Sequence, residues 1–248
     1  TKMDTSLYVA MSGAKQAMLA QAVNSHNLAN ANTSGFKADL SQFRSMPVYG
    51  AGHPSNVYAM AERPGIDFNH GTMQSTGREL DVSINGDGWL AIQAEDGTEA
   101  YTRAGDLRIT PNGLLTTGTG LPVMGGGGPV TMPEAQKIEI GSDGTISIIP
   151  LGDSAATLSV IDRIKLVNPD LADIEKGKDG LFRLKNGADA DPSAQVRLVS
   201  GSVEGSNVSV VSSMVSMIEL ARNFELQVKM MKTVSENEAT SAQLMRLS

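Results

Sequence analysis

Apolar residues recur at spacings of four and three near both ends of the chain, whereas the middle alternates and is rich in turns. The N-terminal stretch from Met3 to about Asn32 contains no proline. Its periodic positions are Leu7, Met11, Ala14, Met18, Gln21, Ser25 and Leu28. Such spacing places side chains on one stripe of a helix. We therefore expect a helix here, ending in the polar run Asn27–Phe36.

The C-terminal stretch from Ser209 to Ser248 has the same period and contains neither proline nor glycine. The stripe comprises Val210, Met214, Met217, Ala221, Phe224, Val228 and Met231, and is widened by Val211, Val215 and Ile218. We expect a second long helix, with Ser209 as its N-cap. Methionine fills irregular gaps in apolar seams, so both Met-rich stripes indicate packing rather than a cofactor site.

Between the two predicted helices lie two segments with different sequence patterns. Residues 36–75 carry Pro47, Pro54 and Pro64 with several glycines and no clear period, which forbids a long helix. We expect this segment to run extended over its own surface or a neighbour's. Residues 76–208 alternate and turn, which indicates an all-β sandwich or irregular barrel. Hairpin turns are expected at Asn85–Gly88, Asp96-Gly97, Pro111–Gly113 and Asp143-Gly144, and a plain turn at Gly125–Gly128. The fold class is thus α+β, with the terminal helices paired as a coiled-coil-like module around a central β domain.

Composition and charge exclude several classes of function. The chain of 248 residues has a net charge of −7, which argues against nucleic acid as the main partner. It has no cysteine, so disulfides and thiolate metal sites are impossible. No apolar run is long enough to span a membrane, and the N-terminus lacks the apolar stretch of a cleavable signal peptide. The sequence leaves open whether Thr1 and Lys2, ahead of Met3, are native.

The N-terminal helix carries little charge, since only Lys2, Asp4 and Lys15 are charged up to residue 32. A helix with so little charge on any side requires neighbours on several sides. Gly13 weakens a helix interior, so we expect it to allow close approach of another backbone. Ordering both helices costs conformational entropy, and this cost is comparable to the free energy gained by burying apolar side chains along one helix–helix contact. We therefore expect self-assembly through the termini, with these helices disordered before assembly and ordered by it.

No motif for chemistry is complete. Ser12–Lys15 matches a serine nucleophile motif but lacks its partner elements, and Gly125–Gly128 lacks the lysine ending of a phosphate loop. Asp81–Gly88 only partly matches a calcium loop. His26, His53 and His70 are too scattered for a metal cluster. We expect no enzyme activity and no cofactor.

Several motifs, in order along nearly the whole chain, resemble bacterial flagellar rod and hook proteins. The N-terminal ones are Asn27-Leu28-Ala29-Asn30, Asn32-Thr33 and Gly35-Phe36-Lys37. The central ones are residues 76–89, Tyr101-Thr102-Arg103, Pro111-Asn112-Gly113 and Leu121-Pro122-Val123. The last are Glu204-Gly205-Ser206-Asn207-Val208 and Ala221-Arg222-Asn223-Phe224-Glu225. The short start, Gly88-Trp89 and the compact middle are similar to proximal rod members, with distal rod members as the alternative and hook proteins third.

The resemblance implies a structural subunit of the rod, exported by the flagellar type III apparatus without a cleavable signal peptide. Residues 1–35 and 209–248 would form the helices of the inner assembly domain around the export channel. Residues 36–75 would contact neighbours and residues 76–208 would form the outer β domain. The partners would be other proximal and distal rod proteins and the export apparatus, in a homo- and hetero-oligomeric helical assembly.

The residues expected to pack between subunits come from both helices and from the turn after the first. They are Leu7, Met11, Ala14, Met18, Asn27, Leu28, Asn30, Gly35, Phe36, Val210, Met214, Met217, Ile218, Ala221, Phe224, Val228 and Met231. A secreted β-domain adhesin with helical stalks is the competing interpretation. Its helices would be charged and solvated, unlike the N-terminal one here.

Overall fold

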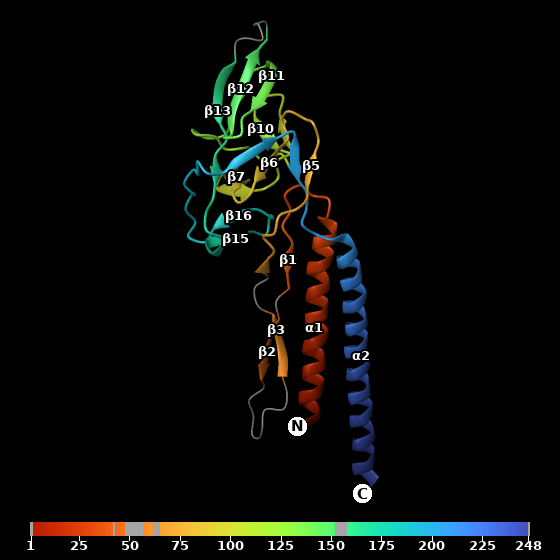
Figure 1. Ribbon diagram of the computed structural model, residues 1–248. Helices are drawn as coiled ribbons and strands as arrows, with labels where there is room; N and C mark the ends of the chain where they lie inside the picture. Colours follow the sequence, from red (N-terminus) through yellow and green to blue (C-terminus); the bar gives the residue numbers. More distant parts are fainter. Residues whose placement is uncertain (1, 42, 48–56, 62–64, 152–157, 248) are drawn as a thin grey trace. The chain divides into compact units, whose positions relative to one another are not determined.

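Two long antiparallel helices form the framework of the first of two structural units (Figure 1). The computed structural model describes residues 2–41, 43–47, 57–61, 65–151 and 158–247. Helix α1 spans Lys2–Ala29 and helix α2 spans Val210–Leu247. Both helices lie where the periodicity predicts them. The Oγ of Ser209 accepts a hydrogen bond from the N–H of Ser212 at 3.4 Å, which confirms the predicted N-cap.

The first unit comprises residues 1–31, 37–68 and 208–248. Beside the helices it holds two short antiparallel pairs, and β3 lies against α1. The strands are β1 (Asp39–Leu40), β2 (Phe43–Pro47), β3 (Val57–Ala61) and β4 (Gly65–Ile66), with β1 paired to β4 and β2 to β3. Up to residue 68, the described part of the segment expected to be extended therefore consists of these strands and short stretches without regular structure. Pro54 and Pro64 lie outside the described residues.

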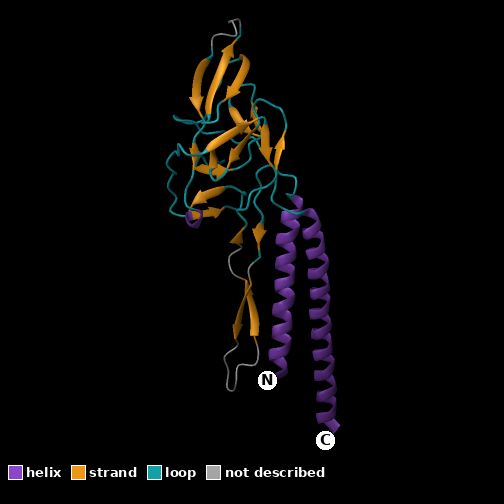
Figure 2. Ribbon diagram, in the orientation of Figure 1, coloured by secondary structure: helices purple, strands orange, loops and turns teal. Residues whose placement is uncertain are grey.

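The second unit comprises residues 32–36 and 69–207 and is built from strands, apart from one short 3₁₀ helix (Figure 2). Its first strands are β5 (Met73–Ser75), β6 (Val82–Asn85), β7 (Trp89–Gln93), β8 (Glu99–Thr102), β9 (Leu107–Ile109), β10 (Leu115–Thr117) and β11 (Ala135–Ile140). The rest are β12 (Thr145–Pro150), β13 (Ser159–Arg163), β14 (Leu166–Val167), β15 (Ile174–Lys176), β16 (Phe182–Leu184), β17 (Arg197–Ser200) and β18 (Ser202–Glu204), with the 3₁₀ helix η1 at Leu171–Asp173.

These strands form several small antiparallel sheets rather than one large one. The widest has the order β14-β7-β8-β16-β15, and β11-β12-β13 form a three-stranded sheet. Strand β6 pairs with β17, β5 with β18, and β9 with β10. Val82, Leu90, Ile92, Leu107 and Leu115 are buried in one shared apolar core. The predicted α+β class, with paired terminal helices and a central β domain, is confirmed.

Most of the predicted turns are confirmed. Asp96-Gly97 joins β7 to β8, Pro111–Gly113 joins β9 to β10, and Asp143-Gly144 joins β11 to β12. At Gly125–Gly128 the chain reverses direction, since Met124 and Pro129 form an antiparallel bridge and the N–H of Gly125 donates to the carbonyl of Gly128. The hairpin predicted at Asn85–Gly88 is wrong. Strands β6 and β7, on either side of this turn, pair with strands of two different sheets.

Candidate functional site

Small side chains line the face of α1 that meets α2. Ala10, Ala14, Ala17 and Ala20 are buried. A Cβ atom added at Gly13 would lie 2.9 Å from Cδ of Gln227 on α2. Gly13 therefore does allow a close approach, but it receives a side chain and not the backbone that the sequence suggested.

The facing side of α2 repeats every four and three residues, as in a coiled coil. Its less exposed positions are Ser213, Met217, Leu220, Ala221, Phe224, Gln227, Met231 and Val234. Two of them mark the antiparallel register, because Gln227 lies opposite Gly13 and the carbonyl of Ser213 accepts from Asn24 Nδ2 at 2.6 Å. The two helices are thus in contact along a regular seam (Figure 1).

A second set of large apolar side chains points away from this seam. Met18 is 61% exposed on α1, and Val211 and Ile218 are 73% and 55% exposed on α2. The outward set also includes Tyr8, Met11, Leu19, Met214, Val215, Leu226 and Met230. A single chain thus leaves part of its methionine, valine and isoleucine side chains in water, outside the seam. Neighbouring exposed apolar side chains of this size are typical of an interaction surface.

The residues expected to pack between subunits fall into three groups. Leu7, Ala14, Leu28, Met217, Ala221, Phe224 and Met231 are buried or half-buried in the single chain. Met11, Met18, Val210, Met214, Ile218 and Val228 are exposed. Asn27 lies in the last turn of α1, and Asn30, Gly35 and Phe36 lie in the segment that follows it. The stripe predicted on α1 therefore runs along the border between its inward and outward faces.

Asn27 holds strand β1 against the end of α1. Its Nδ2 donates to the carbonyl of Asp39 at 2.8 Å, and its Oδ1 accepts from the N–H of Asp39 at 2.9 Å. The amide of Asn27 thereby bonds both backbone groups of Asp39, the first residue of β1, as a paired strand would. Asn30 acts locally, since its Nδ2 donates to the carbonyl of His26 at 2.9 Å. These two asparagines explain why such a polar run ends the helix.

Gly35 and Phe36 belong to the second unit. Gly35 has φ +67°, and a Cβ atom there would lie 2.2 Å from the carbonyl carbon of Arg103. Its N–H donates to the carbonyl of Glu204 at 2.7 Å. The ammonium of Lys176 lies 4.2 Å from the centre of the Phe36 ring, a cation–π contact. Glycine is required at position 35 by both its backbone angle and its surroundings.

Arg103 joins the residues that carry the family-like motifs into what we call the Arg103 cluster: Gly35, Gly86, Gly88, Arg103 and Glu204. Nε of Arg103 donates to Glu204 Oε2 at 2.6 Å. Its Nη atoms donate to the carbonyls of Gly88 at 2.9 Å and Gly86 at 2.8 Å. Both charged side chains are almost fully buried. The turn at residues 85–88, predicted as a hairpin, is thus a loop that wraps a guanidinium.

Sequence reasoning did not single out Arg103 and Glu204 as a pair. Each lies inside a motif that resembles the flagellar family, but the motifs are about a hundred positions apart in the sequence. Glu204 also accepts the N–H of Gly71 at 3.0 Å through Oε1. One carboxylate therefore ties together three distant segments of the second unit.

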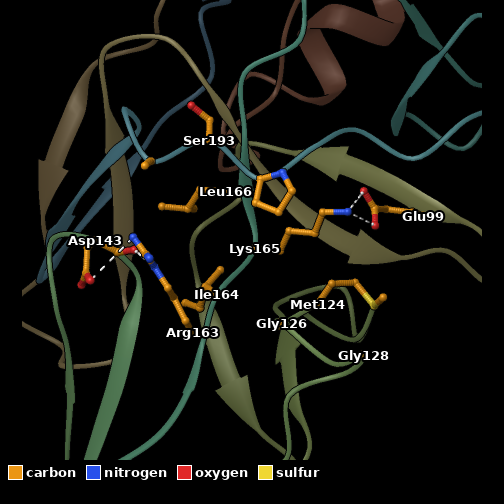
Figure 3. Close-up of a pocket in the computed structure, with 13 residues that line it drawn as sticks. Glu99, Met124, Gly126, Gly128, Asp143, Arg163, Ile164, Lys165, Leu166 and Ser193 are labelled. Atoms are coloured by element: carbon orange, nitrogen blue, oxygen red, sulfur yellow. Dashed lines mark hydrogen bonds and ion pairs between the residues drawn. The ribbon is translucent and has the colours of Figure 1, made fainter.

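A cavity of about 340 Å³ in the second unit is the main alternative site. It is lined by residues that include Glu99, Gly126, Asp143, Arg163 and Lys165 (Figure 3). Lys165 Nζ donates to both Glu99 oxygens at 2.7 and 2.9 Å. Hydrogen bonds from Thr145 hold the pKa of Asp143 below its ordinary value. These charges satisfy one another, and no nucleophile with an adjacent base lines the cavity.

The described residues offer no other chemistry. Among them, no group of three or more metal-ligating side chains is placed to hold an ion. Neither helix, over the part that is described, is long and apolar enough to cross a membrane. Burial raises the pKa of the Tyr101 phenol, whose hydroxyl lies between Glu99 and the N–H of Ala190. This hydroxyl links two segments of the β unit.

Three family models match successive parts of the chain. They are described as "Flagella basal body rod protein" over residues 7–37, "Flagellar hook protein FlgE/F/G D1 domain" over residues 83–148, and "Flagellar basal body rod FlgEFG protein C-terminal" over residues 199–244. The matched parts include most of both helices, Arg103 and Glu204.

Similar proteins match over nearly their whole length. The chain is 43% identical to the flagellar basal-body rod protein FlgF of Salmonella typhimurium over 99% of this chain and 100% of that protein. It is 42% identical to FlgF of Escherichia coli over the same shares. It is 35% identical to the rod protein FlgG of Bacillus subtilis, over 93% of this chain and 95% of that protein.

Proposed function

Since this chain belongs to the flagellar basal-body rod protein family, we propose that it is a structural subunit of the proximal rod that assembles through its terminal helices. It is not an enzyme. The identity of 43% and 42% to the FlgF proteins of Salmonella typhimurium and Escherichia coli, against 35% to FlgG of Bacillus subtilis, favours the proximal over the distal rod. Its partners are copies of itself and other rod proteins, and it is exported by the flagellar apparatus.

One observation carries this proposal: besides the seam between them, the two helices expose a second set of large apolar side chains on their outward faces, Met18, Val211 and Ile218 among them. Covering a valine, leucine, isoleucine or methionine contributes roughly 1.5–3 kcal/mol, far more than covering alanine. These exposed apolar side chains are therefore still available to neighbours. Many such contacts in parallel would make a stiff shaft, because close-packed interiors resist compression.

Complementation of motility tests the proposal. Cells that lack their own proximal rod protein should swim when they express this chain, and imaging of their purified basal bodies should place it in the proximal rod. Val211→Asp should abolish swimming and rod assembly, because it puts a charge into the outward face. Val211 is the second residue of α2, where an acidic side chain favours the helix, so the loss would not arise from an unstable helix.

The matched control is Val199→Asp. Val199 lies on β17 and is 42% exposed, so the same exchange there should leave swimming intact. Normal motility with Val211→Asp, or equal loss with both variants, would contradict assembly through the helices.

A further inference from the structure

Between Tyr8 and Leu19, the exposed side chains on the outward face of α1 are apolar except for one positive charge. Tyr8, Met11, Met18 and Leu19 are exposed on this face. Lys15 is exposed between them, four residues after Met11 and three before Met18, a spacing that keeps all three on one side of the helix. Lys15 is the single Lys, Arg, Asp or Glu between residues 7 and 29.

The outward face of α2 has the complementary character. Its apolar part consists of Val211, Met214, Val215 and Ile218, all at least half exposed. Glu219, Arg222 and Glu225 follow directly on the same side and are exposed. This part of the face therefore carries one excess negative charge. Among the described residues, no ion pair involves Lys15, Glu219 or Glu225.

We infer that the outward face of α1 in one copy docks on the outward face of α2 in a second copy, with Lys15 facing Glu219 and Glu225. The inference rests on the proposed function and specifies its contact. Pairing α1 with α1 would oppose two lysines, and pairing α2 with α2 would oppose two acidic pairs. Like charges placed together disfavour such partners.

The two faces also differ in shape and residues, which sets the kind of assembly. A contact between two different patches leaves one patch of each kind free at the ends, so that further copies can add. A contact of one patch with itself closes as a dimer and stops. An asymmetric contact is therefore what a helical assembly of many subunits requires.

Crosslinking tests this directly, because the natural chain has no cysteine. Met18→Cys and Ile218→Cys place one thiol on each face. Basal bodies from cells expressing both variants, treated with a short bis-maleimide, should yield crosslinked dimers of this chain. Each variant expressed alone should yield almost none. Met18→Cys combined with Val199→Cys on the β unit is the control and should yield none.

Charge reversal then tests the role of Lys15. Adding Lys15→Glu to the Met18→Cys chain should lower the crosslink yield about tenfold, which corresponds to about 1.4 kcal/mol. Adding Glu219→Lys and Glu225→Lys to the Ile218→Cys chain should restore the yield, because the charges are then exchanged. A misfolded variant would not be rescued in this way. The control is Lys232→Glu on α2, added to the Met18→Cys chain in place of Lys15→Glu. It changes the net charge by the same amount and should leave the crosslink yield unchanged.

The outcomes separate this inference from the proposed function. Efficient crosslinking of Met18→Cys alone, no mixed crosslink, or an unchanged yield with Lys15→Glu would each overturn the docking or its charge pairing, while swimming cells would still support the rod function. Failure of the natural chain to restore swimming would instead reject the rod function itself.

Discussion

Nε of Arg103 lies 2.6 Å from a carboxylate oxygen of Glu204, and the two side chains are only 3% and 2% exposed. The remaining donors of the guanidinium go to the carbonyls of Gly86 and Gly88. A buried ion pair is retained only where such extra hydrogen bonds complete it. The pair thus locks β18 to the loop between β6 and β7 and to the turn at Gly35.

Arg103→Ala should destabilise the β unit by about 3–5 kcal/mol, because it leaves the buried carboxylate of Glu204 without its partner. Urea unfolding monitored by fluorescence measures this, since Trp89 is the sole tryptophan and lies 5.9 Å from the guanidinium. Lys137→Ala removes an exposed ion pair with Glu139 and should change stability by no more than about 1 kcal/mol. Equal effects of the two substitutions would refute the role of burial.

Gly35→Ala should cost much more than Gly77→Ala. Both glycines have similar positive φ angles, +67° and +72°, where alanine is strained by about 1–2 kcal/mol. A methyl group at Gly77 meets nothing within 4 Å, whereas at Gly35 it would overlap the backbone of Arg103. The difference between the two unfolding free energies isolates the overlap. If the two variants unfold at the same urea concentration, the close approach at Gly35 is not maintained in solution.

The stability of the β unit should fall in acid. A hydrogen bond from the Arg183 guanidinium holds the pKa of Asp179 below its ordinary value. A carboxylate with a lowered folded-state pKa contributes stability above its unfolded pKa of about 3.9, and this is lost as the pH falls through the folded value. The free energy of unfolding should therefore be level from pH 7 to 5 and decline below about pH 4.

Asp179→Asn checks the assignment of this pH dependence. The variant should be less stable than the natural chain at pH 7, and the difference should shrink as the pH falls below about 4. A constant difference across this range would show that the ionised form of Asp179 contributes nothing.

Met217→Asp and Phe224→Asp should block rod assembly while leaving the β unit folded. Both positions are half-buried on the seam side of α2, so an aspartate there would put a charge against the alanine face of α1. Motility assays combined with Trp89 fluorescence separate the two effects. Normal swimming by either variant would contradict the prediction, as would a shifted unfolding transition of the β unit.

The helix pair should be weakly protected in a dilute single copy. Burying an alanine side chain contributes little free energy, whereas ordering both helices costs conformational entropy. Amide exchange in residues 5–30 and 210–245 should therefore be much faster than in the core strands of the β unit. Equally slow exchange in both regions would show that the pair is stable without neighbours.

Periodicity sufficed to predict both helices and most hairpins, because these features depend on local spacing and turn residues. It could not decide which face of α1 turns inward, since Ala14 and Met18 share one stripe and only the partner helix separates them. The loop at residues 85–88 has the glycines and asparagine of a hairpin turn, but a distant arginine decides its role. Arg103 and Glu204 are paired by the tertiary fold, which no local pattern reports.

The alanine seam also limits how such a protein can change over evolutionary time. At Ala10, Ala14 and Ala17 only glycine or serine is close enough in size to be accepted, because a larger group would push the helices apart. Outward positions such as Met18 and Ile218 can exchange among apolar residues as long as neighbouring subunits change with them. Related rods should therefore diverge on the outside of this pair first, and incompatible partners between species should arise there.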